Sequence, residues 1–141
     1  MFPELKLISD EDLNDSDKIV FTVPDGEVYE VLWIHVEYAA SADAGNRALN
    51  VQFRDADDDV VLQRYMGEAI TVSETWHCLF APGVPLQEDE AGVGIKQAYV
   101  PLPTPMMLPA GFDLRITDSS AVAAAADDMV VHALVRRRQV G

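Results

Sequence analysis

The sequence has one cysteine, few bases and no run of apolar residues long enough to cross a bilayer. Cys78 has no second cysteine to pair with, so we expect a fold that does not depend on oxidation and that forms in a reducing cytoplasm. The first residues lack the basic and apolar segments of a secretory signal. No window reaches the roughly 20 apolar residues that a membrane helix needs. We therefore expect neither a disulfide framework nor membrane contact.

Positive charge is also scarce: ten bases stand against 24 acids, and the formal net charge is -14. Affinity for nucleic acids comes largely from bases that neutralise phosphates, so this balance excludes nucleic acid and anionic membranes as expected partners. The one basic cluster, Arg136 to Arg138, lies near the C-terminus. It is either a solvated tail or an anchor for an acidic partner.

Helical periodicity is nearly absent, and alternation of apolar and polar residues takes its place. In residues 47–54, for example, Leu49, Val51 and Phe53 alternate with polar or small residues, as in a strand with one buried face. A short helix at 120–128 is as plausible as an ordered loop, and the proline-rich segment 101–109 cannot be a central strand. The predicted strands cover residues 19–23, 28–38, 47–54, 60–66, 70–80, 97–102, 112–118 and 129–136.

About eight short strands separated by turn signals predict an all-β fold, an antiparallel jelly-roll β-sandwich with an N-terminal extended arm. At 141 residues the chain fits a single domain. We assign residues 1–17 to an acidic arm, 18–138 to the sandwich and 139–141 to a C-terminal tail.

Two of the predicted strands are apolar on both faces, which a sandwich that buries one face of each sheet does not require. In strand 28–38, strict alternation places Val28, Leu32, Ile34, Val36 and Tyr38 on one face, with Glu30 as the exception. The other face carries Tyr29, Val31, Trp33, His35 and Glu37. Strand 129–136 has the same character. A loop of the same chain, a neighbouring subunit or a ligand groove is expected to cover the second face.

If a neighbouring subunit covers that face, the interface residues follow from the same alternation, with the nearby arginines added. The predicted interface residues are Tyr29, Val31, Trp33, His35, Val130, His132, Leu134, Arg136 and Arg137.

Candidate catalytic and metal sites are weak. Residues 55–59 match the first ligands of an EF-hand, but Val60 and Met66 replace its glycine and its final glutamate, so a solvated hairpin tip is the better interpretation. His77 and Cys78 are strand neighbours that point to opposite faces, which prevents the histidine from activating the thiol. We expect no enzyme activity, no metal ion and no cofactor.

Two ligand-binding alternatives stay open. A metal-dependent jelly-roll enzyme would need His35, Glu37 and His132 to converge on one ion. A carbohydrate-binding module would use exposed aromatic side chains, with Trp33 and Trp76 as the first candidates.

Residues 19–61 and 108–137 carry a "VPDGEVYEVLW" turn and strand, an "AGNR" turn and a late "LPAGFDLRI" strand. This pattern resembles jelly-roll structural proteins of tailed bacteriophages, although Tyr29 stands where the pattern favours tryptophan. The resemblance implies a capsid decoration or cement protein, which forms a homotrimer and binds the major capsid protein. It also implies a place on the outer surface of the phage head, after synthesis in the host cytoplasm. The alternative is a glycan-binding module of a tail or head fibre.

Overall fold

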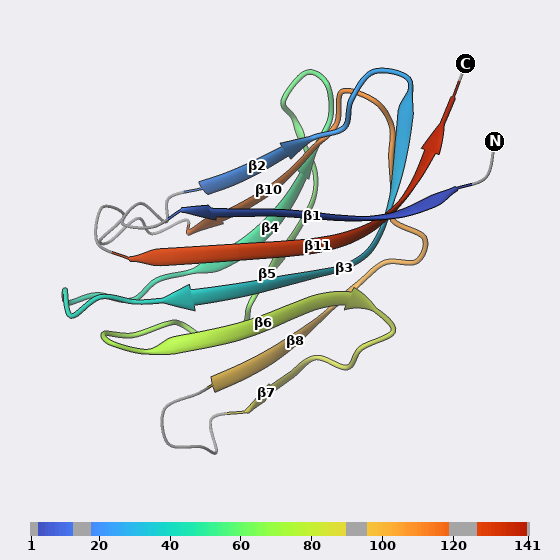
Figure 1. Cartoon of the computed structure of the whole chain (residues 1–141). Helices are drawn as coiled ribbons and strands as arrows, with labels where there is room; N and C mark the ends of the chain where they lie inside the picture. The colour runs from blue at the N-terminus through green and yellow to red at the C-terminus, as the bar shows by residue number, and fades with distance from the viewer. Residues whose placement is uncertain (1–2, 13–17, 90–95, 119–126, 141) are drawn as a thin grey trace.

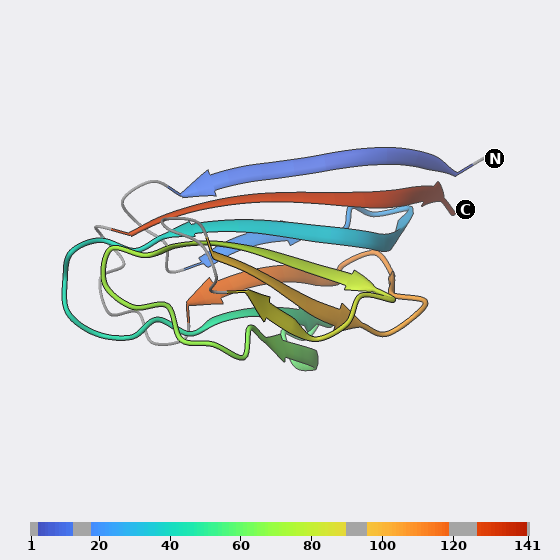
Figure 2. The same cartoon turned by 90° about the horizontal axis from the view of Figure 1, so that it is seen from below.

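The structure is a computed structural model, and it describes residues 3–12, 18–89, 96–118 and 127–140. Two β-sheets pack face to face over one core, as the perpendicular views show (Figures 1 and 2). The described residues contain no helix, so none of them forms a membrane-spanning one. The all-β sandwich predicted from the alternation is confirmed.

The larger sheet has seven strands and the smaller sheet four. In the larger sheet the order is β1 (Glu4–Asp12), β11 (Asp128–Gln139), β3 (Glu27–Ala39), β6 (Thr75–Pro82), β8 (Lys96–Leu102) and β7 (Gln87–Asp89), and β9 (Met107–Leu108) also pairs with β3. In the smaller sheet the order is β2 (Lys18–Thr22), β10 (Asp113–Asp118), β4 (Leu49–Arg54) and β5 (Val60–Tyr65).

The strand order is that of a jelly roll. Eight strands form two four-stranded antiparallel arrays, β1-β11-β3-β6 and β2-β10-β4-β5, and successive strands β1 to β4 alternate between the sheets. Strands β7, β8 and β9 are additions between β6 and β10. Of these, β8 pairs in parallel with β6 and therefore covers what would be an open sheet edge.

The core lies between the sheets and follows the predicted alternation. The largest fully buried apolar side chains come from strands of both sheets and include Trp76, Tyr38, Phe53, Phe80 and Ile34. Burying a side chain of this size contributes about 1.5–3 kcal/mol to stability. Cys78 is buried in the core and His77 is not, so the predicted separation of these two neighbours is confirmed.

Much of the predicted N-terminal arm is a strand. Residues 4–12 form β1, which pairs antiparallel with β11 over its whole length. Its described side chains remain mostly exposed, and Leu5 and Leu7 are 65% and 55% exposed. The arm therefore docks as an edge strand through its backbone and adds little to the core. Residues 13–17 lie outside the described part of the chain.

Other boundaries differ for local reasons. Residues 70–74 do not belong to β6: Ile70 makes an isolated bridge to Arg47, and a turn precedes Thr75. The proline-rich segment contributes Met107 and Leu108 to a two-residue strand beside β3. Most of the expected helix, residues 120–126, lies outside the described residues, and its last residue, Asp128, begins β11.

Candidate functional site

A β-bulge in β3 decides which of its side chains can meet another molecule. Leu134 pairs with Trp33 but the next residue, Val135, pairs with Val31, which leaves Leu32 without a partner on β11. One extra residue reverses the inside and outside positions along a strand. Tyr29 and Val31 before the bulge and Ile34 after it are therefore all buried in the core.

The bulge corrects the prediction that Tyr29, Val31, Trp33 and His35 share one face. Strict alternation failed because it carried one phase through the bulge. Tyr29 and Val31 are 5% and 1% exposed and lie between the two sheets, so they are not on the outer face. Trp33 and His35 do lie on the outer face and are half-buried. The outward positions of β3 are more polar than expected.

The outer face of the larger sheet remains the broadest candidate site. No described element crosses it, as Figure 1 shows from the front. The registers of five paired strands, β1, β11, β3, β6 and β8, place side chains in rows across this face. Its described members are Leu5, Leu7, Ser9, Glu30, Trp33, His35, Glu37, His77, Leu79, Gln97, Tyr99, Val130, His132, Leu134 and Arg136.

One row is apolar and crosses three strands. Leu7 of β1 is opposite Leu134 of β11, which is opposite Trp33 of β3. Leu134 and Trp33 are half-buried by their neighbours on the sheet, whereas Leu7 is mainly exposed. Exposed apolar side chains that gather in this way mark interaction surfaces more often than scattered ones do.

The three histidines of the chain lie together beside this row, and we call them the histidine cluster. His132 of β11 is opposite His35 of β3, and the ring of His77 from β6 lies 5.4 Å from that of His35, centre to centre. His35 and His132 were among the predicted interface residues, whereas His77 was not. Its outward phase in β6 was readable, but its proximity to His35 depends on the order of β3 and β6.

The surroundings of His35 disfavour its charged form. Burial lowers the pKa of His35, and the nearby imidazoles of His77 and His132 lower it further, while the carboxylate of Glu37 acts in the opposite direction. The Nδ1 atom of His132 is buried and makes no hydrogen bond. The histidine cluster therefore contains a buried polar atom that is left without a hydrogen bond.

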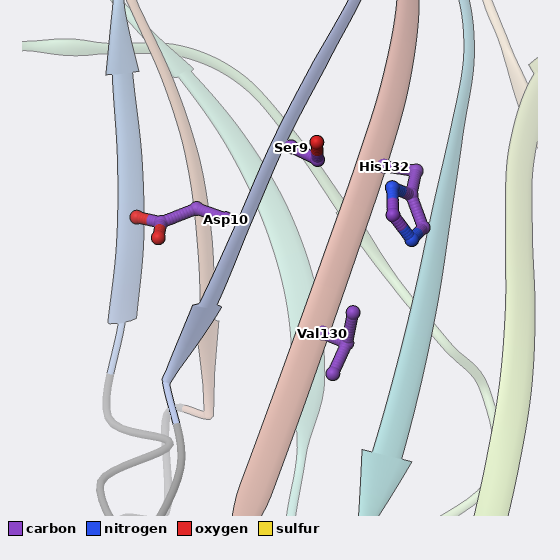
Figure 3. A pocket seen from close by; sticks show the side chains of 4 residues that line it. All are labelled: Ser9, Asp10, Val130 and His132. Atoms are coloured by element: carbon purple, nitrogen blue, oxygen red, sulfur yellow. The ribbon is translucent and has the colours of Figure 1, made fainter.

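A hollow of about 300 Å³ lies next to the histidine cluster, lined by Ser9, Asp10, Val130 and His132. Figure 3 shows His132, Val130 and Ser9 on one side of β1 and β11, with Asp10 turned towards β2. A second hollow of about 200 Å³ is lined by His35, His77 and Tyr99 among others. Both are shallow depressions of the sheet, so the face suits a broad contact better than an enclosed small molecule.

The C-terminal arginines already have partners within the chain. Arg136 Nη1 lies 2.7 Å from Glu30 Oε1, and Arg137 contacts Glu4 at 2.6 Å and Glu27 at 3.2 Å. Both belong to β11, which continues to Gln139. The interpretation as a solvated tail is therefore wrong for Arg136 and Arg137, which belong to a strand, while an anchor for an acidic partner stays a prediction.

A second polar cluster lies at one end of the sandwich and was missed in the sequence. The guanidinium of Arg47, fully buried, donates from Nε and Nη2 to the Asp127 carboxylate at 2.9 and 3.1 Å. It also donates to the carbonyl of Gly45 at 2.7 Å and to that of Asp43 at 3.0 Å. The Tyr38 hydroxyl lies 2.9 Å from carboxylate oxygens of both Asp118 and Asp127.

This Arg47 cluster is structural. The bonds to Arg47, with those from Tyr38 and from the Ser41 amide, lower the pKa of Asp127 to about 2 although burial acts in the opposite direction. The cluster joins the "AGNR" turn to the segment before β11. Turn composition predicted the turn, but charged residues are rarely fully buried, so sequence gave no reason to expect Arg47 inside.

The ligand-binding alternatives lose most of their residues. Trp76 is fully buried and Tyr29 nearly so, so neither is available to stack on a sugar ring. Among the described residues, no three His, Cys, Asp or Glu side chains are placed to hold a metal ion. The acidic loop at 55–59 is a hairpin tip in which Asp55 Oδ1 accepts hydrogen bonds from the amides of Asp57 and Asp59. That prediction is confirmed.

No protein-family model and no curated protein sequence matches the chain. Among solved structures, the chain is similar to a chain in the structure of infectious bursal disease virus, Gx strain. The TM-score is 0.33, and the identity is 11% over 99% of this chain and 37% of the virus chain. The VP2 subviral particle of that virus gives a TM-score of 0.30 with 11% identity over the same shares of both chains. The chain thus spans well under half of these proteins, and similarity this low carries no argument about function.

Proposed function

We propose that this chain is a non-enzymatic structural subunit of a virus particle, a decoration or cement protein of a phage head. In this role it bridges capsid subunits on the outer surface and contacts further copies of itself. The observation that carries the proposal is the outer face of the larger sheet, where the apolar row of Leu7, Leu134 and Trp33 lies beside the histidine cluster. Contact with a second molecule would bury the apolar side chains of this face, which lowers the free energy.

The motifs that resemble phage proteins are structural in this fold. Gly26 in the "VPDG" turn has a φ of 77°, and Gly111 in the "LPAG" turn has a φ of 86°. Backbones in this region favour glycine, so these turns have a conformational reason. Arg47 of the "AGNR" turn forms the buried cluster with Asp127. These motif residues stabilise turns and the interior, and the outer face of the larger sheet stays accessible. This arrangement supports a role in assembly.

Charge supports an exterior position. A chain with a net charge of -14 is repelled by packaged DNA and tolerated on the outside of a shell. Among the described residues, the glycan-binding alternative retains Trp33 on β3 and Tyr99 on β8, which β6 separates, and Tyr65, 48% exposed, on the smaller sheet. These do not form a stacking platform.

The test is incorporation into particles. Purified protein is mixed with undecorated heads, and bound copies are counted relative to the major capsid protein after gradient sedimentation. Leu7→Glu adds one charge to the outer face, and Val61→Glu adds the same charge at a residue of the smaller sheet that is 60% exposed. We expect near-stoichiometric binding by the wild type and Val61→Glu, and loss of at least about tenfold in affinity for Leu7→Glu. Absence of binding by the wild type would overturn the proposal.

A further inference from the structure

Two imidazoles meet on the outer face of the larger sheet because of the strand order. The rings of His35 on β3 and His77 on β6 lie 5.4 Å apart, centre to centre, with an angle of 35° between their planes. The direct partner of His77 on β3 is Glu37, so the two histidines are diagonal neighbours across antiparallel strands. Diagonal neighbours on one face of a sheet are within reach of each other when their side chains are long or aromatic.

We propose that His35 and His77 together bind one divalent transition-metal ion. Imidazole nitrogen is a ligand that suits zinc, copper and nickel, whereas calcium and magnesium take oxygen ligands. A pair of imidazoles therefore selects the first class of ion. No metal ion was expected from the sequence, because His77 reaches His35 only through the order of the strands.

The separation of the two rings fits a shared ion. At a Zn–N distance of about 2.0–2.1 Å each ring centre lies roughly 3.2 Å from the ion, and at a tetrahedral angle two such centres are about 5.2 Å apart. The observed 5.4 Å differs from this value by an amount that small side-chain rotations supply. His35 and His77 are half-buried and line the same hollow of about 200 Å³, which has room for an ion and several waters.

The third histidine is not part of this pair. His132 is the register partner of His35 on β11, on the side away from His77, and it lines the other hollow. Among the described residues, no three His, Cys, Asp or Glu side chains are placed to hold one ion. The proposed site is therefore an open one, in which two imidazoles bind the ion and water occupies its remaining positions.

A carboxylate lies beside both imidazoles. Glu37 follows His35 by two residues on the outward side of β3 and is the register partner of His77. Histidines that bind metal ions usually donate their second ring N–H to a carboxylate, a carbonyl or water, which orients the ring and strengthens the ligand. Glu37 already acts to raise the pKa of His35, against the larger effect of burial. We assign Glu37 as a positioning residue of the site.

The experiment is calorimetric titration of the purified full chain, without an affinity tag, with ZnCl2 and with NiCl2 at pH 7.5. Excess CaCl2 is present throughout, so that sites made only of oxygen ligands are occupied. We expect one zinc or nickel ion per chain. His35→Gln and His77→Gln should each weaken binding at least about tenfold, Glu37→Gln should weaken it less, and the matched control His132→Gln should bind like the wild type.

Three calorimetric results would overturn the inference: a wild type that binds neither ion, binding that survives both His35→Gln and His77→Gln, and a loss in His132→Gln as large as that in His77→Gln. Circular dichroism establishes that each variant is folded, and an asparagine variant replaces a glutamine variant that is not.

The wild type provides a second measurement that needs no variant. On addition of zinc, the proton NMR signals of two of the three imidazole rings should shift and those of the third should stay. Shifts in all three rings or in none would contradict the pair. Metal binding and binding to heads are measured separately, so failure of one leaves the other proposal standing.

Discussion

The outer faces of the two sheets differ in the kinds of side chain that gather on them. On the smaller sheet, the Gln52 amide donates to Gln63 at 2.7 Å and its carbonyl accepts from Arg54 at 2.9 and 2.8 Å. Arg115 on the same face is ion-paired with Asp58 at 3.0 Å. On the larger sheet, an apolar row lies beside three histidines. We infer that the outer face of the smaller sheet is adapted to water and that of the larger sheet to a second molecule.

The largest expected effect is on the free energy of unfolding and comes from Arg47. This arginine is buried at one end of the sandwich and lies on neither outer face. Arg47→Met leaves the Asp127 and Asp118 carboxylates buried without their cation, and we expect a loss of about 3–5 kcal/mol in the free energy of unfolding. Urea denaturation measures it. The matched control is Arg54→Met on the outer face of the smaller sheet, whose ion pair with the exposed Asp58 predicts a loss below about 1 kcal/mol. Equal losses would contradict the structural role of Arg47.

The two faces of the larger sheet should separate stability from association. Ile34→Ala removes a fully buried core side chain, and we expect a loss of about 2–5 kcal/mol in the free energy of unfolding. Leu134→Ala on the outer face should cost clearly less than that in dilute solution but weaken self-association. Urea denaturation at low concentration and sedimentation at high concentration provide the two measurements. If the Leu134→Ala variant associates like the wild type, the apolar row is not part of the interface.

Acid should destabilise the fold through buried carboxylates. The pKa of Asp127 falls from an ordinary 3.8 to about 2 in the folded chain, so the unfolded state binds a proton first. The resulting stability, about 2 kcal/mol, is fully present above pH 4 and is lost as the pH falls through 2. Denaturation at several pH values should show this fall. In Asp127→Asn the fall should shrink, and an unchanged pH profile would contradict the assignment.

The smallest effect is expected on the water-adapted face. Gln52→Leu removes hydrogen bonds to Gln63 and Arg54 and should cost about 1 kcal/mol of stability. It should not alter the sedimentation of the protein at any pH. A change in association state caused by Gln52→Leu would mean that the smaller sheet also takes part in assembly, and that the contrast between the faces is wrong.

The jelly roll was predictable because its strands alternate clearly and its turns carry glycine and proline at the expected places. Local alternation of apolar and polar residues does not predict the order of the strands in a sheet. For the same reason it did not predict that residues 4–12 pair with β11. The extra residue in β3 was equally hidden, because Leu32 has the same apolar character as its neighbours. That one residue moved Tyr29 and Val31 from the predicted interface into the core.

The candidate site was predictable in part for the same reasons. Trp33, His35, Val130, His132, Leu134 and Arg136 lie on the outer face as the alternation required. His77 and Leu7 joined them only through strand order, which depends on contacts between distant residues. The buried Arg47 cluster followed from neither pattern nor composition, since a fully enclosed ion pair is rare enough that a surface position was the natural expectation.

Tryptophan fluorescence on dilution tests the central claim most directly. Trp76 is fully buried within the chain in any assembly state, so a change of emission on dissociation reports Trp33 on the outer face. Diluting the wild type at pH 7.5 from its associated to its monomeric range should shift the emission to longer wavelength, and Trp33→Phe should abolish the shift. Dissociation without any shift in the wild type would show that copies meet elsewhere and would contradict the assignment of this face.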